Sequence, residues 1–451
     1  MQITVPKNVR TIIGILQDNG FEAYAVGGCV RDSILGIVPN DWDITTNAMP
    51  LQVKSLFRRT IDIGIKHGTV KVMMGNEGYE ITTYRIDGVY EDSRHPKEVT
   101  FTTDLYEDLR RRDFTINAMA YSDKSGIVDP FEGQSDLRSG IIRAVGSPRE
   151  GFGEDALRIL RALRFSARFG YEIEEETASA IRELSPTLSN ISAERIREEL
   201  EKLLLSDNPD RLRWAYELGV TKVFFPEWDA MMECEQDTPH HFTDVGDHTI
   251  EVIRYIIENY PSLSKEDDRV LRIAALLHDI AKPVKKFRGR DGYEHFTGHP
   301  EEGVPMAEDV LKRLKYDNDT INKTKKLVRY HDELPDLTYP EVRRFIVLAG
   351  RENMDNLIRL KYADLYGHTK YKWDEKMEKL TSFEQMYQKI VRDGDPLSIK
   401  ELAVNGNDLM KEGVAPGPAL GEALERLMDR VLDDPQMNEK EKLLMYHRGD
   451  G

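Results

Sequence analysis

YAVGGCVRDSILGIVPNDWDITT, the stretch from Tyr24 to Thr46, decides the fold of the first part of the chain. It opens as a strand-like run that ends at a glycine pair, continues as a short helical segment, and closes with Asp41-Trp42-Asp43 at the start of a second expected strand. Because side chains alternate along a strand, Asp41 and Asp43 are expected on one face, close together. Carboxylates held that close repel each other unless a cation lies between them, and oxygen ligands of this kind suit Mg²⁺.

The glycine pair and the arginine between these strands predict a phosphate site. Gly27-Gly28 lets backbone N–H groups approach a phosphate closely, and Arg31 supplies charge-assisted donors. Together with the two carboxylates, this set is typical of a metal-dependent nucleotidyl-transfer site. The alternative interpretation is an ordinary turn followed by an acidic strand edge.

The composition indicates a globular chain of about three domains. Hydrophobic residues make up 40% and charged residues 32% of the 451 positions. The net charge of -17 argues against a surface that binds polyanions everywhere. The charge is uneven, however, because Leu311 to Tyr330 holds seven Lys and Arg against two Asp. A local basic surface is therefore compatible with the acidic total.

Cysteine usage and hydropathy point to a soluble, cytoplasmic protein without a membrane partner. Cys29 and Cys234 are the only cysteines and are far apart, which favours a reducing compartment and excludes a zinc cluster built from cysteines. No apolar run approaches the roughly twenty residues of a membrane span. The first twenty residues lack the apolar core of a signal peptide. The sequence leaves the oligomeric state open.

The next segments extend a small α+β domain. Thr69 to Met74 and Tyr79 to Tyr84 alternate as paired strands around a glycine-containing turn. Glu80, on the second of them, would supply a third carboxylate to the metal site or would face solvent. Arg85 to Thr100 is polar and aperiodic, and a loop of that length inside a compact domain is usually functional or disordered.

Three consecutive arginines end in Asp113. Arg111 and Arg112 would direct positive charge toward a triphosphate, and the Asp113 carboxylate would face ribose hydroxyls. The alternative is an arginine-rich helix end that satisfies terminal carbonyls.

Glu154 to Phe169 is expected to be one long amphipathic helix. Leucines form one stripe, and a charged row recurs every third residue on another face, comprising Asp155, Arg158, Arg161 and Arg164. Such a row usually forms a salt-bridged solvent face. Because Asp offers acceptors and Arg planar donors, it could instead match the Watson–Crick edge of a base.

Histidines and aspartates gather in the second half of the chain. His278-Asp279 ends an otherwise apolar helix, where such a pair is costly to bury unless it binds something. A single histidine is more often a core residue, but the whole ordered set predicts a divalent-metal site that suits Mn, Fe, Ni or Zn. The set is His248, His278, Asp279, His299, His331 and Asp364.

Taken together, these motifs resemble class II tRNA nucleotidyltransferases, the bacterial CCA-adding enzymes, of the subgroup with an inserted HD domain. The wider superfamily also holds the bacterial poly(A) polymerases. The matching motifs are Gly27-Gly28-x-Val30-Arg31-Asp32 with Asp41-x-Asp43, Arg111-Arg112-Asp113-Phe114-Thr115-Ile116-Asn117-Ala118, and Glu154-Asp155-x-x-Arg158-x-x-Arg161, continued by Arg164.

The resemblance implies a multidomain fold. A small α+β, polymerase-β-like nucleotidyltransferase head would span residues 1–138, neck and body helices 139–235, an all-α HD domain 236–375, and a helical tail 376–451. It also implies roles for the motif residues. Asp41 and Asp43 would hold two Mg²⁺ ions, Gly28 and Arg31 the triphosphate, Arg112 and Asp113 the sugar and phosphates, and Asp155 and Arg158 the base, supported by Arg161 and Arg164.

The implied activity is template-independent addition of CCA to the 3′ end of tRNA from CTP and ATP, with HD-domain phosphohydrolase activity on RNA end phosphates at a second divalent metal. One alternative is a poly(A) polymerase or an enzyme that adds only CC or only A. The loop from Arg85 to Thr100 resembles the flexible loop of full CCA-adding enzymes. A second alternative is an HD phosphohydrolase with a nucleotide-sensing N-terminal domain. A non-enzymatic RNA-binding protein would leave both metal constellations unexplained.

Overall fold

A seven-stranded mixed sheet lies at the centre of the first part of the computed structural model, which describes residues 3–88, 99–238 and 243–449. The order of strands across the sheet is β3-β4-β5-β2-β1-β8-β9. Their bounds are Thr60–Gly64, Thr69–Met74, Glu77–Thr83, Ile44–Thr46, Ala23–Val26, Ala120–Ser122 and Gly126–Val128. All neighbours pair antiparallel except β2 and β5, which are parallel. The predicted α+β head is confirmed.

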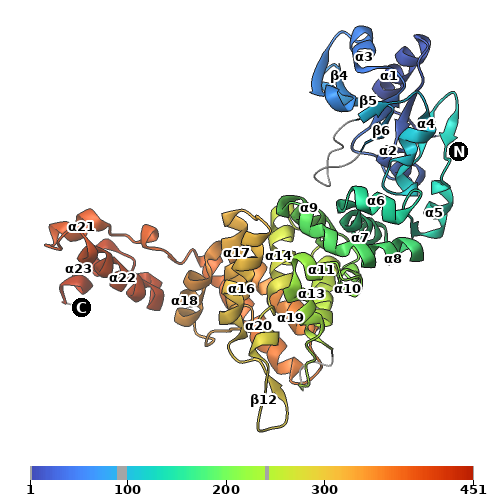
Figure 1. Cartoon of the computed structure of the whole chain (residues 1–451). Helices are drawn as coiled ribbons and strands as arrows, with labels where there is room; N and C mark the ends of the chain where they lie inside the picture. The colour runs from blue at the N-terminus through green and yellow to red at the C-terminus, as the bar shows by residue number, and fades with distance from the viewer. Residues whose placement is uncertain (1–2, 89–98, 239–242, 450–451) are drawn as a thin grey trace. The chain divides into compact units, whose positions relative to one another are not determined.

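Short helices accompany this sheet (Figure 1). They are α1 Lys7–Asp18, α2 Gly28–Ile34, α3 Pro50–Leu56, α4 Leu105–Arg110 and α5 Gly133–Ser139. The loop predicted over Arg85 to Thr100 is wrong at its ends, which form a small hairpin of β6 Arg85–Asp87 with β7 Val99–Phe101, and its residues 89–98 lie outside the described part of the chain.

The second strand begins later than its sequence pattern predicts. β2 starts at Ile44, which pairs with Ala25 of β1, so Asp41 and Asp43 precede the strand. The backbone N–H of Val26 still donates to the carbonyl of Asp43 at 3.0 Å. Trp42 is buried, whereas Asp41 and Asp43 are exposed. The alternation that underlies the prediction is therefore kept at the end of the sheet.

The chain is mainly helical after the seven-stranded sheet. The first unit of the chain continues through α6 Pro148–Glu154, α7 Leu157–Phe169, α8 Glu175–Leu184, α9 Ala193–Leu204, α10 Arg211–Glu217 and α11 Thr221–Phe224. A short parallel pair, β10 Ile141–Ile142 and β11 Glu172–Ile173, connects α7 to the segment before α6.

The predicted helix over residues 154–169 is wrong at its start. α6 ends at Glu154, and Asp155 has extended backbone angles (φ -133°, ψ 98°) before α7 begins at Leu157. The Asp155 carboxylate accepts a hydrogen bond from the backbone N–H of Leu157 at 3.1 Å. A short acidic side chain that satisfies a free N–H at a helix start favours such a break.

The second compact unit spans Glu227–Gly451 and is helical. Its first helices are α12 Pro226–Met232, α13 Val245–Asn259, α14 Lys265–Leu277, α15 Lys282–Lys285, α16 His299–Arg313, α17 Asn318–Tyr330, α18 Tyr339–Ala349, α19 Met354–Tyr366 and α20 Trp373–Asp393. α13 packs against α14 and α19, and α17 packs against α14 and α16. A hairpin of β12 Phe287–Arg288 and β13 Glu294–His295 projects from these helices (Figure 1).

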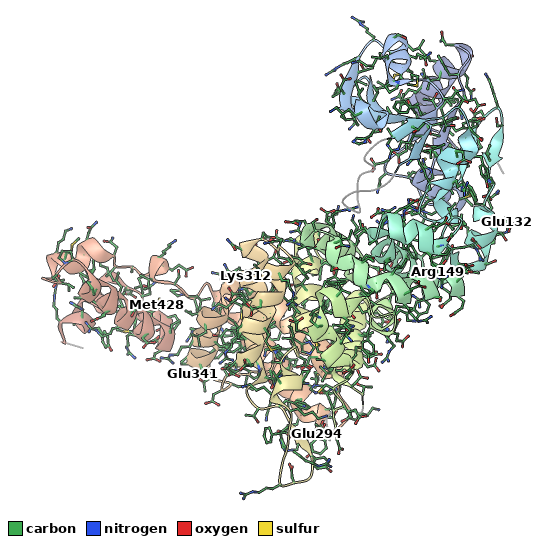
Figure 2. All side chains as sticks on the ribbon, in the orientation of Figure 1. Glu132, Arg149, Glu294, Lys312, Glu341 and Met428 are labelled. Atoms are coloured by element: carbon green, nitrogen blue, oxygen red, sulfur yellow. The ribbon has the colours of Figure 1, made fainter. Side chains whose placement is uncertain are left out.

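Three helices form the C-terminal part of this unit: α21 Gly406–Lys411, α22 Pro418–Asp433 and α23 Lys440–Arg448. Arg343 of α18 anchors them, because its Nε contacts Asp395 at 2.6 Å and its Nη1 donates to the carbonyl of Leu432 at 3.0 Å. No helix within the described residues is long and apolar enough to cross a membrane. Side chains over both units are drawn in Figure 2.

Candidate functional sites

The paired aspartates lie beside a third carboxylate. Protein atoms around the Asp43 carboxyl remove part of its hydration and raise its pKa, an effect that Arg112 offsets in part. The negative charges of Glu80 and Asp41 raise this pKa further. Glu80 on β5 also forms an ion pair with Lys71 at 3.3 Å. Because Glu80 interacts electrostatically with Asp43, the structure places it near the pair, where a cation would relieve the repulsion.

Gly27 brings its backbone against an arginine. It has a φ of +79°, and a Cβ atom at this position would lie 2.8 Å from Nη1 of Arg112. A side chain here would be strained by the backbone and would displace the guanidinium. Gly28 follows as the first residue of α2.

Arg31 is buried rather than presented on the surface. Its Nε donates to Asp32 at 2.8 Å, and its guanidinium lies 5.1 Å and 5.0 Å from the ring centroids of Phe165 and Phe169. Burial lowers its pKa, and Asp32 opposes that effect. Asp32 also contacts Arg168 at 3.1 Å. These contacts attach α2 to α7, and the predicted contact of Arg31 with a triphosphate stays a prediction.

Asn117 joins two of the predicted motifs. Its side-chain oxygen accepts a hydrogen bond from Nη1 of Arg31, and its Nδ2 donates to Oδ1 of Asp113 at 3.0 Å. Oδ2 of Asp113 accepts from Nε of Arg161 at 2.8 Å and also from its Nη2. Burial would raise the pKa of Asp113, but Arg161 and Asn117 hold it well below its usual range. A continuous polar chain therefore runs from α2 to α7.

Arg112 is held by a buried carboxylate. Its Nη2 lies 3.7 Å from Asp108, which also pairs with Arg111 at 2.9 Å. Nε of Arg112 is buried without a hydrogen-bond partner in the part of the chain that the structure describes. An unused donor so close to Asp43 is suited to an anionic ligand.

The charged row on α7 is not a solvent face. Arg158 is buried and donates to the carbonyl of Arg111 at 2.8 Å. Arg164 contacts Glu199 of α9 at 2.9 Å, and burial lowers its pKa to about 10. Asp155 lies 3.8 Å from Arg195, and burial raises its pKa. The row therefore contacts the head and α9, with Asp155 beside the helix rather than in it.

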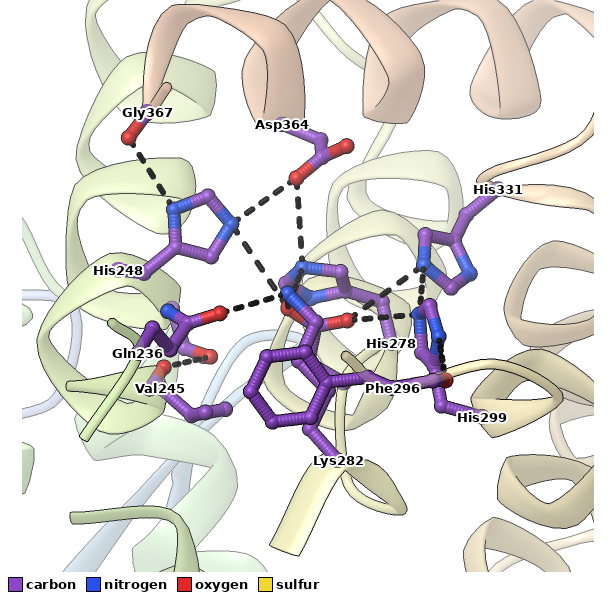
Figure 3. A network of polar contacts seen from close by, with 12 residues as sticks. Gln236, Val245, His248, His278, Lys282, Phe296, His299, His331, Asp364 and Gly367 are labelled. Atoms are coloured by element: carbon purple, nitrogen blue, oxygen red, sulfur yellow. Dashed lines mark hydrogen bonds and ion pairs between the residues drawn. The ribbon is translucent and has the colours of Figure 1, made fainter. Parts of the chain in front are cut away.

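The six predicted metal-ligand residues come together where five helices meet (Figure 3). His248 lies on α13, His278 and Asp279 follow α14, His299 begins α16, His331 follows α17, and Asp364 lies on α19. Potential ligand atoms of His248, His278 and Asp364 lie within 4.8 Å of one another, as do those of His278, Asp279 and His331. Within residues 3–88, 99–238 and 243–449, these are the groupings of three or more potential ligands.

Backbone carbonyls orient all four imidazoles. Nδ1 of His278 lies 2.7 Å from the carbonyl of Ala275, and the other three rings contact Gly367, Phe296 and Val328 in the same way. A carbonyl only accepts, so Nδ1 of each ring donates to it, and Nε2 is the nitrogen that faces the carboxylates and the other imidazoles. Nε2 of His299 faces Nε2 of His331 at 3.3 Å. Two acceptors that face each other are stabilised by a cation between them.

The carboxylates of Asp279 and Asp364 add negatively charged oxygen ligands to the four imidazoles. Nε2 of His278 and Oδ2 of Asp279 are buried and lie 3.2 Å apart, and Nζ of Lys282 lies 2.6 Å from the same oxygen. Burial would lower the pKa of His278, but Asp279 and Asp364 raise it to about 10, so a metal that binds Nε2 would displace a proton from it. Asp279 has a pKa well below its usual value, against the effect of burial, because His278 and Lys282 neutralise it. The donor set of imidazole nitrogen and carboxylate oxygen fits a divalent transition metal.

Sequence reasoning missed several residues of both sites. Lys282 contacts Asp279 at 2.6 Å and donates to Gln236 at 2.9 Å, and His368 lies 3.3 Å from Asp364. Helical spacing could have identified Lys282 and His368, because they lie three and four residues after the carboxylates they contact. No spacing rule connects Asn117 to Arg31, which are 86 residues apart.

A mixed-sheet head with paired carboxylates, followed by helices, has the architecture of a nucleotidyltransferase. Residues 23–143 match the poly A polymerase head domain, residues 170–232 the probable RNA and SrmB-binding site of polymerase A, and residues 303–446 the putative tRNA nucleotidyltransferase domain 2. The chain belongs to the family of CCA-adding enzymes. The CCA-adding enzyme of Pediococcus pentosaceus is 33% identical over 97% of this chain and 96% of its own. That of Lactiplantibacillus plantarum is 33% identical over 97% and 95%.

Solved structures of CCA-adding enzymes have the same fold as this chain. The Bacillus stearothermophilus CCA-adding enzyme in complex with CTP aligns with a TM-score of 0.69 and 29% identity over 97% of this chain and 96% of its own. The Thermotoga maritima enzyme complexed with tRNA aligns with a TM-score of 0.62 over 100% and 99%, and its 23% identity supports the fold alone. The predicted family and fold class are confirmed, whereas the assignment to a subgroup with an HD domain stays a prediction. Four of the six proposed metal ligands, His248, His278, Asp279 and His299, lie within residues 233–302, outside the three matched regions, and the geometry of the histidine-rich metal cluster is what supports it.

Proposed function

We infer that this chain adds CCA to the 3′ end of tRNA from CTP and ATP without a nucleic-acid template. The similarity to CCA-adding enzymes along almost the whole of both chains carries this conclusion. Since its substrate would be tRNA, we propose that the chain works in the cytoplasm. We retain a head over residues 1–138, neck and body helices over 139–235, a metal-binding helical domain over 236–375, and a tail over 376–451. The boundary between the two compact units, at Pro226, falls inside the second of these segments.

In this proposal, Asp41 and Asp43 hold Mg²⁺ with carboxylate oxygens, and Glu80 adds negative charge beside them. The oxygen-only donor set and the raised pKa of Asp43 fit a hard cation. When bound, Mg²⁺ would activate the tRNA 3′-hydroxyl and neutralise charge on the triphosphate. Nε of Arg112, which is buried without a hydrogen-bond partner among the described residues, would donate to a phosphate oxygen.

Residues at the start of α7 would recognise the base of the nucleotide. Asp155 would supply an acceptor and Arg158, which also donates to the carbonyl of Arg111, would supply planar donors, while Arg161 holds Asp113 for the ribose. Ion pairs with Asp113 and Glu199 hold Arg161 and Arg164 in place, so little conformational entropy is lost when a nucleotide binds. Arg31 supports the phosphate side through Asn117.

An extension assay with separate nucleotides tests this function. tRNA lacking its 3′ CCA is incubated with CTP, with ATP, or with both, and the products are sized and sequenced. We expect two cytidines with CTP alone and complete CCA with both nucleotides. Long oligo(A) products would indicate a poly(A) polymerase, and a stop after CC with both nucleotides would indicate a partial enzyme. The Asp43→Ala variant serves as the inactive control.

We also propose a hydrolytic function for the metal cluster of the second unit. The observation that favours it is the meeting of Nε2 atoms from His299 and His331 beside the buried carboxylate of Asp279. The cluster would hold Mn, Fe, Ni or Zn, which supplies an activated water when bound. For an RNA end phosphate, the water oxygen bonds to phosphorus, the bond from phosphorus to the ribose oxygen breaks, and that oxygen takes a proton. Lys282 and His368 lie close enough to orient the phosphate.

Phosphate release from RNA with a 3′-phosphate or a 2′,3′-cyclic phosphate tests this second function. Metal-supplemented protein should release phosphate or open the ring, and Asp41→Ala with Asp43→Ala should preserve that activity. His278→Ala should abolish it while CCA addition continues. If wild-type protein loaded with each metal turns over neither substrate, the cluster has a structural function instead.

A further inference from the structure

The predicted triphosphate ligands of the head lie to one side of the paired aspartates. In the sheet, β2 follows Asp41 and Asp43 and separates β1 and β8 from β5, β4 and β3. Gly28 begins α2 directly after β1, and a Cβ atom on Gly27 would lie 2.8 Å from Nη1 of Arg112. The expected ligands of the triphosphate therefore belong to the β1 side, and contacts with the second substrate are expected on the β5 side.

The strand register on the β5 side places four side chains in one row. Ile44 of β2 lies opposite Ile81 of β5, and both are buried, so the carboxylates that precede them point to the other face of the sheet. Residues opposite each other in a sheet share a face, and the pairing of β5 with β4 and of β4 with β3 extends the row to the edge strand. From the catalytic pair to the edge, the row is Asp43, Glu80, Lys71 and Ile61.

This row faces solvent, whereas the opposite face of the same strands belongs to the core. Val70 and Val72 of β4 are fully buried. The side chain of Lys71 is 33% exposed, and Ile61 is 43% exposed. Lys71 forms an ion pair with Glu80 at 3.3 Å, and an exposed pair of this kind contributes little stability. A phosphate can therefore attract the lysine at small cost, and the isoleucine beside it offers apolar surface.

The geometry of in-line displacement decides from which side the tRNA end arrives. The attacking and leaving oxygens lie on opposite sides of the phosphorus that is transferred. In the proposed reaction, Arg112 holds the leaving phosphates on the β1 side, so the 3′-hydroxyl attacks from the side of Glu80 and β5. The nucleotides that precede this hydroxyl then extend over β4 and β3, where Lys71 and Ile61 lie.

We propose that Lys71 and Ile61 form the surface of the head that positions the 3′ end of tRNA. Lys71 contacts a phosphodiester of the last nucleotides, and Ile61 packs against a nucleoside of the same segment. This inference rests on the proposed CCA addition, and it adds the residues that bind the acceptor strand to those that bind the incoming nucleotide.

Two lysines of the head allow a matched comparison. Lys54 of α3 pairs with Asp62 of β3 at 2.9 Å, and its side chain is 33% exposed, as is that of Lys71. Asp62 lies opposite the buried Val70, so this second pair belongs to the other face of the same strands. Lys54→Ala therefore removes an equally exposed, equally paired lysine that does not face the catalytic carboxylates.

Steady-state kinetics with tRNA that lacks its CCA end tests the proposal on the full chain. One phosphate contact on a single strand contributes about 5-fold in affinity at about 0.1 M salt. Lys71→Ala should raise KM for tRNA by this factor, leave KM for CTP unchanged, and reduce the slope of log KM against log salt concentration by about 0.7. Ile61→Ser should raise KM for tRNA without changing that slope, and Lys54→Ala should change neither quantity.

The alternative is that Lys71 contacts the triphosphate. A higher KM for CTP in Lys71→Ala, with KM for tRNA unchanged, would overturn the proposal. So would equal KM values in Lys71→Ala and Lys54→Ala. In both cases the wild-type chain would still add CCA, so the proposed function would stand.

A binding readout covers the opposite case, in which the wild-type chain adds no nucleotide and the proposed function fails. tRNA that carries 4-thiouridine as its last nucleotide before the CCA position is crosslinked to the full chain, and the modified peptides are identified by mass spectrometry. Crosslinks to peptides of β3 or β4 support the surface, and they should weaken in Ile61→Ser. Crosslinks within the head that are confined to α4 and β8 would contradict it.

Discussion

Replacing Asp113 with alanine should destabilise the first unit as well as impair catalysis. The change removes the partner of Arg161 and leaves the N–H of Phe114 and Nδ2 of Asn117 without their acceptor. Removing one member of a buried pair costs about 3–5 kcal/mol, and we reduce this to about 2–4 kcal/mol because the Arg161 side chain is 32% exposed. For a unit of this size, each kcal/mol lowers the melting temperature by about 2–4 °C. A loss of roughly 3 kcal/mol thus corresponds to about 6–12 °C.

Differential scanning calorimetry of the full chain measures this effect, and a double-mutant cycle with Arg161→Ala isolates the pair. The two changes should couple by more than about 0.5 kcal/mol. A smaller coupling, or an unchanged melting transition, would refute the structural role and leave Asp113 as a nucleotide contact only.

The same residue gives a pH dependence with a defined sign. The pKa of Asp113 is depressed in the folded state, so its stabilising contribution is present above the unfolded-state pKa of about 3.9 and is lost as pH falls through the folded-state value. Asp113→Asn keeps one acceptor oxygen but cannot ionise. The melting temperatures of wild type and Asp113→Asn should therefore differ by a constant amount from pH 7 to about 5 and converge below about pH 4.

Three further outcomes are expected. Asp41→Ala and Asp43→Ala should each lower CMP incorporation, measured with labelled CTP, by at least about 1,000-fold. The metal content of the histidine cluster should stay unchanged in both variants. Loss of that metal would show a folding defect instead. His278→Ala should weaken metal binding at least about 10-fold, measured by elemental analysis after dialysis against graded chelator, and a wild-type metal content would contradict the ligand assignment. Burial raises the pKa of Cys29 to about 12, so a thiol reagent at pH 8 should modify it only after unfolding; rapid labelling of the native chain would disprove its burial.

The sequence was most informative where one local pattern determines the arrangement. Alternation places Asp41 and Asp43 on the exposed side around buried Trp42, even though the strand begins later than predicted. The order of histidines and aspartates likewise predicted a cluster that five helices bring together. In the first case the spacing along one segment fixes the side on which the side chains lie. In the second, the cost of burying a polar pair without a ligand predicts that the pair binds something.

The features that the sequence did not predict depend on hydrogen bonds and contacts formed in the folded structure. A helical period continues through Asp155, yet a capping contact to Leu157 breaks the helix there, because a local hydrogen bond competes with the helical one. Arg31 has the chemistry of a phosphate ligand, but Phe165 and Phe169, more than 130 positions away, bury its guanidinium. Propensity and period contain no information about such distant neighbours.

The chain from Arg31 through Asn117 and Asp113 to Arg161 changes how the motif residues should be understood. Arg31, Asp113 and Arg161 are predicted contacts for different parts of a nucleotide, yet hydrogen bonds also join them to one another, with Asn117 between Arg31 and Asp113. A nucleotide that contacts Arg112 with its phosphates and Asp155 with its base would bind to segments that these hydrogen bonds already connect. Removing any member then alters the others, so lost activity alone does not assign a ligand contact. A residue that touches the nucleotide raises KM for CTP or ATP at unchanged melting temperature, whereas one that only supports the chain lowers both stability and kcat.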